Sequence, residues 1–179
     1  MVSSALRAPD HGGLIPWRLI QFSDGQRESL ATLFEQEKHR RDPNASDLDL
    51  DHAREHATRV PTVLAFVIAP IGNSQVPDHE QLLSAGAALG NFLLAAHALG
   101  YGAIVLSGER CKDTDLCRAV GVKKRETLAG FISLGTIKTA PPLQRLHDPN
   151  QVLSAWSPIS KNSTLEDVAV VPQPKRPVM

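Results

Sequence analysis

The most constraining feature of the sequence is the segment from Glu80 to Leu99, where leucines are interspersed with alanines and glycines. This composition predicts one long helix that is buried on nearly all sides. Because small residues let another helix approach closely, we expect this helix at the centre of the molecule or on a dimer axis. Asn91 and His97 interrupt the apolar run, and Gly100 and Gly102 divide its end, so the sequence predicts no membrane span.

Shorter segments on both sides predict amphipathic helices and apolar strands. Helices are expected at about Gln26–Arg41, from Ser46 or Asp47 to Thr58, and from Asp113 or Thr114 to Val120. Strands are expected at Trp17–Phe22, Val63–Ile68, Gly102–Leu106 and Leu128–Leu134. The run Val63–Ile68 is apolar throughout, which is typical of a strand buried on both faces. The order mixes α and β elements.

The character of the chain changes after Gly135, where Pro-Pro and Asp-Pro pairs leave little room for helices. We therefore expect a main domain over residues 1–140 and an extended arm of the same domain over 141–179. The arm carries Val152, Leu153 and Trp156, which need a surface to cover them. A partner subunit is the favoured surface, and the chain's own body is the alternative.

The charge balance argues against nucleic-acid binding. Lys and Arg total 19, Asp and Glu also total 19, and aromatic residues make up only 4%. The chain therefore has neither an excess of positive charge to bind phosphates nor many aromatic side chains on which bases could stack. The N-terminal residues lack the pattern of a secretory signal, so we expect a cytoplasmic protein. Cys111 and Cys117 are accordingly expected as free thiols, with a disulfide or redox pair as the minor alternative.

One short motif suggests metal chemistry. In His52-Ala53-Arg54-Glu55-His56, two imidazoles and a glutamate lie on one helical face, as in some metal-dependent hydrolases. The surrounding segment is charged nearly all round, which is typical of a solvated helix. We therefore keep a hydrolase using His52, Glu55 and His56 as a remote alternative and expect no metal.

A loop-and-strand motif near the N-terminus carries the strongest functional signal. The segment Arg7-Ala8-Pro9-Asp10-His11, followed by Pro16-Trp17, resembles the flavin-contacting loop of the nitroreductase family. Further similarities follow in the family's order: Ala95–Ala103 at the end of the central helix, Ser107-Gly108 after the next strand, and Gly130–Thr136 in the last core strand. The resemblance covers about residues 5 to 137.

The resemblance implies an α+β fold with a mixed, mainly antiparallel sheet flanked by helices, and a homodimer with an extended C-terminal arm. It implies FMN bound between the subunits. It also implies that NAD(P)H is the reductant and that a small molecule, a nitroaromatic or a quinone, is the acceptor. The flavin would carry out the chemistry, so no catalytic side chain is expected. The positions that would contact FMN are Arg7, Pro9, Asp10, His11, Val105, Leu106, Ser107 and Gly108. The region that would meet NAD(P)H comprises Ala95, Ala96, His97, Ala98, Leu99 and Gly100.

Two departures from the family pattern leave a second interpretation open. Leu106 stands where relatives often place an arginine, and the Arg-Arg-Ser segment that usually precedes the loop is not found in the six residues before Arg7. Three explanations remain open: the protein could begin upstream of Met1, the N-terminal helix that carries this segment could have been lost, or other Lys or Arg residues could replace its cations. The alternative is a flavin-poor dimeric binding protein without turnover. For His97, a core or interface position is the default expectation.

Overall fold

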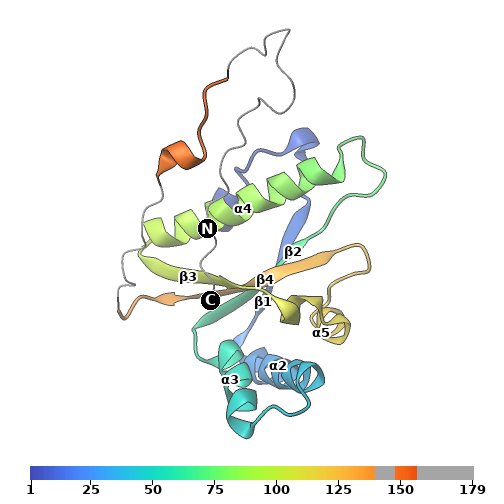
Figure 1. Ribbon diagram of the computed structural model, residues 1–179, viewed down its shortest axis with the longest axis vertical. Coiled ribbons are helices and arrows are strands. Elements are labelled where there is room, and N and C mark those ends of the chain that lie inside the picture. The colour runs from blue at the N-terminus through green and yellow to red at the C-terminus, as the bar shows by residue number, and fades with distance from the viewer. Residues whose placement is uncertain (140–147, 157–179) are drawn as a thin grey trace, which may run out of the picture. The chain divides into compact units, whose positions relative to one another are not determined.

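The computed structural model describes residues 1–139 and 148–156, and its centre is a four-stranded sheet. The strands are β1 (Trp17–Phe22), β2 (Thr62–Ile68), β3 (Tyr101–Leu106) and β4 (Thr127–Thr136), in the order β1-β2-β4-β3. Each neighbouring pair is antiparallel (Figure 1). The sheet and its helices belong to one unit, Met1–Lys138, and a second unit begins at Thr139.

Strand β2 lies in the interior of the sheet because its side chains are apolar on both faces. Val63, Ala65 and Val67 face one core, whereas Leu64 and Phe66 face the other. This is the strand predicted to be buried on both faces, and the prediction is confirmed. Two separate helical layers therefore cover the sheet (Figure 1).

The first layer consists of α2 (Arg27–Arg41), α3 (Asp47–Thr58) and the short α5 (Thr114–Ala119). Their apolar faces form one core with the sheet, and its largest members are Leu30, Phe34, Leu116, Leu128 and Phe131. The ends of α3 and α5 follow from their caps: Ser46 Oγ accepts a hydrogen bond from Asp49 N, and an Asp113 oxygen accepts one from Leu116 N. The sequence left Ser46 or Asp47, and Asp113 or Thr114, as the capping residues, and in the structure Ser46 and Asp113 are the caps.

The second layer consists of α4 (Asp78–Ala98) and a four-residue helix, α1 (Val2–Ala5), which the sequence did not predict. Ala85, Ala88 and Phe92 of α4 pack against the sheet. The prediction that this helix is buried on nearly all sides is wrong for the single chain. The opposite face is exposed, with Leu83 and Leu94 at 71% and 69% of their full exposure, because one sheet can cover only one side of a helix.

Short 3₁₀ segments complete the described chain: η1 (His11–Gly13), η2 (Asp24–Gln26), η3 (Glu109–Lys112) and η4 (Pro149–Gln151). Strand β4 runs two residues beyond its predicted end, because Gly135 and Thr136 pair with Gly102 and Tyr101 of β3. The predictions for 140–147 and 157–179 of the arm lie outside the described residues. In the part of the chain that is described, no helix is long and apolar enough to cross a membrane.

Candidate functional site

The loop that carries the predicted flavin motif is folded by Asp10. Its carboxylate accepts a hydrogen bond from Ile15 N at 2.7 Å, and its carbonyl accepts one from Gly13 N at 3.1 Å. Gly12 and Gly13 have positive φ angles of 78° and 62°, which glycine adopts without strain and which tighten the loop. The Asp10 carboxylate therefore shapes the backbone, and its charge is directed at the loop itself.

His11 connects this loop to the start of α4. Its Nδ1 lies 2.8 Å from a carboxylate oxygen of Glu80, in the first turn of that helix. Both side chains remain open to solvent. The contact holds the imidazole beside the first turn of α4.

Arg7 lies in a groove between α1 and α4. The groove has a volume of about 420 Å³ and is lined by Ser4, Arg7, Asn91, Leu94, Ala95 and Ala98. Asn91 Nδ2 donates a hydrogen bond to the carbonyl of Ser4 at 3.3 Å, which joins the two helices at the base of the groove. Arg7 is exposed and has no ion-pair partner within 4.0 Å among residues 1–139 and 148–156.

The groove joins two sets of predicted residues. Arg7 belongs to the positions expected to contact FMN, and Ala95 and Ala98 belong to those expected to meet NAD(P)H. Leu94 lines the same groove and is also part of the exposed apolar face of α4. The groove therefore opens beside the surface that the single chain leaves uncovered.

The remaining predicted FMN positions, Val105 to Gly108, lie at the end of β3. Leu106 is the last strand residue, and Gly108 has φ 106° and ψ −153°, a conformation open almost only to glycine. Leu106 and Ser107 line a second hollow of about 310 Å³, together with Arg41, His56 and Arg110. In the single chain, Arg7 thus lines one hollow, and Leu106 and Ser107 line another.

An ion-pair network behind this second hollow was not expected from the sequence. Glu37 is buried and lies between two arginines, with Arg41 Nε at 2.6 Å and Arg110 Nε at 3.1 Å. The Arg110 guanidinium also lies over the Phe34 ring, 4.2 Å from its centre. A glutamate in phase with Leu30 and Phe34 on an amphipathic helix was the only signal in the sequence that could have revealed it.

The network also engages His56, one of the two histidines in the motif considered for metal binding. Arg110 lies 3.1 Å from His56 Nδ1, and burial together with the Arg110 charge lowers the pKa of this imidazole. The neutral ring therefore accepts a hydrogen bond from the guanidinium. Within the described ranges, no group of three His, Cys, Asp or Glu side chains is arranged to hold a metal ion.

Other predicted roles can be compared directly with the structure. His97 is exposed in the last turn of α4, so a core position is wrong, because the turn of the helix places it on the face of Leu83 and Leu94. Trp17 is buried and stacks on Phe66 with ring centres 5.8 Å apart. Both cysteines are free thiols, as predicted.

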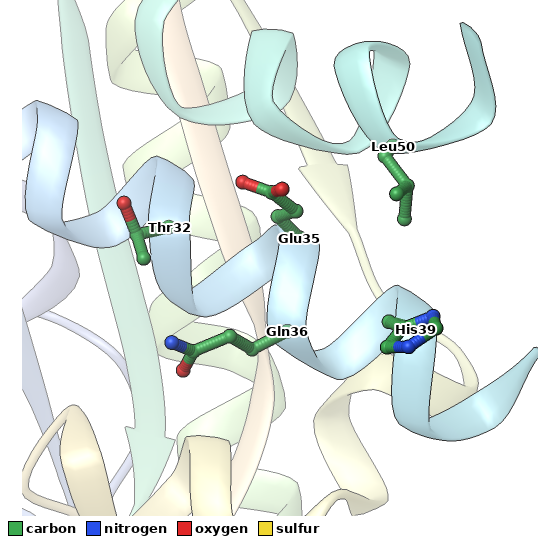
Figure 2. A pocket seen from close by; sticks show the side chains of 5 residues that line it. All are labelled: Thr32, Glu35, Gln36, His39 and Leu50. Atoms are coloured by element: carbon green, nitrogen blue, oxygen red, sulfur yellow. The ribbon is translucent and has the colours of Figure 1, made fainter. Parts of the chain in front are cut away.

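A further hollow lies between α2 and α3 and contains none of the predicted site residues. Figure 2 shows its lining: Thr32, Glu35, Gln36 and His39 come from α2, and Leu50 comes from α3. Glu35 is already paired with Arg54 at 2.6 Å. This hollow offers no group that the flavin-type motif requires, so we place the candidate site at the Arg7 groove and the end of β3.

Comparison with known proteins adds independent information. A family model described as the nitroreductase family matches residues 1–136. YdjA of Escherichia coli (strain K12), whose name proposes an NAD(P)H nitroreductase, is 31% identical over 136 residues, which are 76% of this chain and 73% of that protein.

Two solved structures show the same fold at low sequence identity. The nitroreductase-like family protein from Bacillus cereus has a TM-score of 0.71 at 15% identity, over 88% of this chain and 82% of that chain. The NADPH:FMN oxidoreductase from Vibrio harveyi complexed with NAD⁺ has a TM-score of 0.65 at 15% identity, over 90% of this chain and 67% of that chain.

An antiparallel sheet between two helical layers, with a Pro-Asp-His loop tied to the long helix, places the chain in the α+β class of nitroreductase-like folds. The sequence comparisons carry this further than the fold alone, because one relative exceeds 30% identity over most of both chains. The chain belongs to the nitroreductase family. The family resemblance inferred from the loop motif is thereby confirmed.

Proposed function

We propose that the protein is a homodimeric, FMN-dependent oxidoreductase of the cytoplasm that uses NAD(P)H to reduce nitroaromatic or quinone-type acceptors. One observation carries this proposal: Arg7 lies in the same groove as Ala95 and Ala98, beside the exposed apolar face of α4. A flavin bound there would meet the positions implied for both cofactors and would lie next to a subunit interface.

The residues of the groove suit the chemistry of FMN. Its phosphate needs cationic or N–H donors, and its ring, when reduced, needs a nearby donor or cation for the negative charge that develops. The Arg7 guanidinium is exposed and unpaired within the described residues, and the nearby Asp10 carboxylate is occupied by the Ile15 amide. The Asp10 carboxylate is therefore held against the loop backbone and forms no ion pair with Arg7.

Each residue of the proposed site then has a distinct role. Arg7 binds the anionic part of the cofactor, Asp10 sets the loop backbone, and His11, held by Glu80, limits the position of the loop. Ser107 and Gly108 present backbone and a hydroxyl at the end of β3. When bound, FMN supplies the hydride chemistry, accepting two electrons from the nicotinamide and giving them to the acceptor.

Sharing one groove between reductant and acceptor favours ping-pong kinetics, because the oxidised nicotinamide must leave before the acceptor can enter. The exposed face of α4 supports a homodimer, since Gly86 and Gly90 leave open space where a partner helix could approach. We include in this proposal that residues 141–179 form an arm that packs on the partner subunit and that residues 1–140 form the flavin-binding domain.

The visible absorption spectrum of the purified protein, with and without added FMN, tests the proposal. We expect bound flavin after removal of excess FMN, and NADH or NADPH oxidation that depends on a nitroaromatic or quinone acceptor. Parallel lines in double-reciprocal plots would support the ping-pong order. If saturating FMN leaves no bound flavin and no oxidation occurs, the oxidoreductase proposal fails.

A second candidate, a flavin-poor dimeric binding protein, is favoured by the second hollow. Leu106 provides no cation there, and the two arginines beside it are both engaged by Glu37. This candidate predicts a dimer that binds FMN weakly and shows no turnover. The same spectrum and turnover assay therefore distinguish it from the enzyme.

A further inference from the structure

A hollow between η3, α5 and β4 shares no residue with the candidate flavin site. It has a volume of about 600 Å³, within the range of small-molecule pockets. It is bounded by η3, α5 and the start of β4, and Cys111, Cys117, Val122 and Leu128 form its apolar wall. None of the residues predicted to contact FMN or NAD(P)H lines it.

The two thiols behave as apolar surface in this wall. Burial raises the pKa of Cys111 to about 11, and burial also raises the pKa of Cys117. Cys117 Sγ donates to the carbonyl of Cys111 at 3.3 Å, which satisfies its weak donor. At neutral pH both groups are therefore uncharged, and they offer a ligand polarizable, apolar contacts.

The rim of the same hollow is cationic. Lys123 and Lys124 line it, and neither has an ion-pair partner within 4.0 Å in the described part of the chain. The one acid in the lining, Glu126, is engaged by Arg18 at 2.7 Å. The hollow thus combines an apolar interior with two ammonium groups at its edge that form no ion pair within the described residues.

We propose that this hollow is a second binding site, specific for a small amphipathic carboxylate whose apolar body enters the wall and whose anionic group meets Lys123 and Lys124. An apolar molecule without charge would leave the ammonium groups unused. A small hydrophilic anion would leave the apolar wall in contact with water. Only a molecule with both parts satisfies both surfaces.

Isothermal titration with octanoate tests the proposal, with acetate and octan-1-ol as matched probes. We expect saturable octanoate binding, weaker at high salt because the ammonium groups are solvent-exposed, and no saturable binding of acetate. Octan-1-ol should bind about tenfold more weakly than octanoate. The proposal is overturned if octan-1-ol binds as tightly as octanoate. It is also overturned if the heat of octanoate binding shows no saturation up to millimolar concentration.

Charge variants locate the anionic end. Lys123→Gln combined with Lys124→Gln should weaken octanoate binding about tenfold and leave octan-1-ol binding unchanged. The control variant, Arg59→Gln with Lys138→Gln, removes the same charge from exposed positions outside the hollow and should bind octanoate normally. An equal loss in both variants would show that net charge alone is responsible and would overturn the site.

Amide NMR spectra locate the apolar end. Octanoate should shift backbone signals within residues 111–128, both in flavin-free protein and in protein saturated with FMN. Shifts confined to the Arg7 groove would overturn the proposal. Because this readout does not require flavin or turnover, failure of the second site and failure of the proposed oxidoreductase activity are separate results.

Discussion

Arg7 is the residue on which the flavin site depends most, because its guanidinium is the free cation of the groove. Arg7→Ala should weaken FMN binding about ten- to a hundredfold, the cost of one charge-assisted hydrogen bond. The melting temperature of the flavin-free protein should hardly change, since the side chain is exposed and makes no ion pair in the described structure. Fluorescence titration with FMN and a thermal melt measure the two effects.

Two variants sharpen this test. Arg59→Ala removes an exposed arginine outside the groove and should leave FMN binding unchanged. Arg7→Lys keeps the charge but loses the planar fork of the guanidinium. Near-normal affinity in the lysine variant indicates a charge effect, and a loss close to that of alanine indicates a bidentate contact. Normal affinity in both Arg7 variants would exclude Arg7 from the site.

Cys111 leads to a prediction about pH. Because burial raises its pKa to about 11, only about one thiol in a thousand is ionised at pH 8. Cys117→Ala removes the smaller contribution of Cys117 to this pKa and leaves burial as the main cause. In that background iodoacetamide should still modify Cys111 much more slowly than in the unfolded chain, with a rate that keeps rising above pH 8.5. A rate that levels off near pH 8.5 would contradict the assigned environment.

The raised pKa of Cys111 also makes the free energy of unfolding depend on pH. Between about pH 8.5 and pH 11 the unfolded thiol loses its proton while the folded thiol keeps it, so the folded state binds more protons. The contribution of Cys111 to the free energy of unfolding is therefore intact below about pH 8.5 and is lost as the pH rises through 11. Urea unfolding of wild type and Cys111→Ala over this range measures it.

At the scale of elements, the pairing of β3 with β4 depends on a glycine. A Cβ at Gly130 would lie 2.7 Å from Val105 Cγ1 and 3.0 Å from the carbonyl oxygen of Leu106. Backbone cannot move away as cheaply as a flexible side chain, so Gly130→Ala should separate the strands where β3 ends. We expect a loss of about 1–3 kcal/mol in the free energy of unfolding, measured with urea.

Gly25→Ala is the matched control, because an added Cβ there meets nothing within 4 Å and the backbone φ is ordinary. It should change stability by less than about 0.5 kcal/mol. FMN affinity should fall in Gly130→Ala as well, since the displaced strand end leads into Ser107 and Gly108. Normal stability of Gly130→Ala would show that the strands tolerate the methyl group.

The elements were predictable where the signal is local. The periodicity of α2, the caps Ser46 and Asp113, and the apolar run of β2 are each set by neighbours in the sequence. The burial of α4 was not predictable, because its apolar residues cover all sides and only the sheet decides which of them are buried. The Glu37 network joins residues 73 positions apart, beyond the reach of any local pattern.

At the scale of the whole molecule, the exposed face of α4 predicts the state of association. Leu83→Arg combined with Leu94→Arg places two charges on this face, and we expect the protein to become a 19.4 kDa monomer. Desolvating these charges in an apolar interface without partners is unfavourable. Sedimentation velocity at micromolar concentration measures the mass, and flavin retention should fall with dissociation.

Leu48→Arg serves as the control, since Leu48 is similarly exposed but lies on α3, in the opposite layer. It should leave the mass unchanged. A wild-type protein that is already monomeric at micromolar concentration would contradict the dimer proposal directly. A dimeric double variant would show that another surface forms the interface.

The residues of each loop in the candidate site could be predicted from the sequence, but the arrangement of the loops relative to one another could not. Arg7 and His11 were identified from a motif within a few residues of each other. Their relation to Ser107 depends on chain folding and, in our proposal, on a second subunit. In one chain Arg7 and Ser107 line different hollows, so no pattern within the sequence could specify how they meet.

The irregular pairing between β2 and β4 has a consequence for how this family member can change in length. Phe66 pairs with Gly130 but Val67 pairs with Leu128, so Ala129 has no counterpart on β2. This extra residue allows Leu128 and Phe131 to face the same core, although they are three positions apart. Deleting Ala129 would leave Leu128 and Phe131 two positions apart, so strict alternation would keep both on the same core, while the bulge and the contact of Ala129 with the opposite core would be lost. The strand should therefore accommodate the loss of this one residue, whereas a single deletion beyond Phe131 would turn the later side chains of β4 to the opposite face.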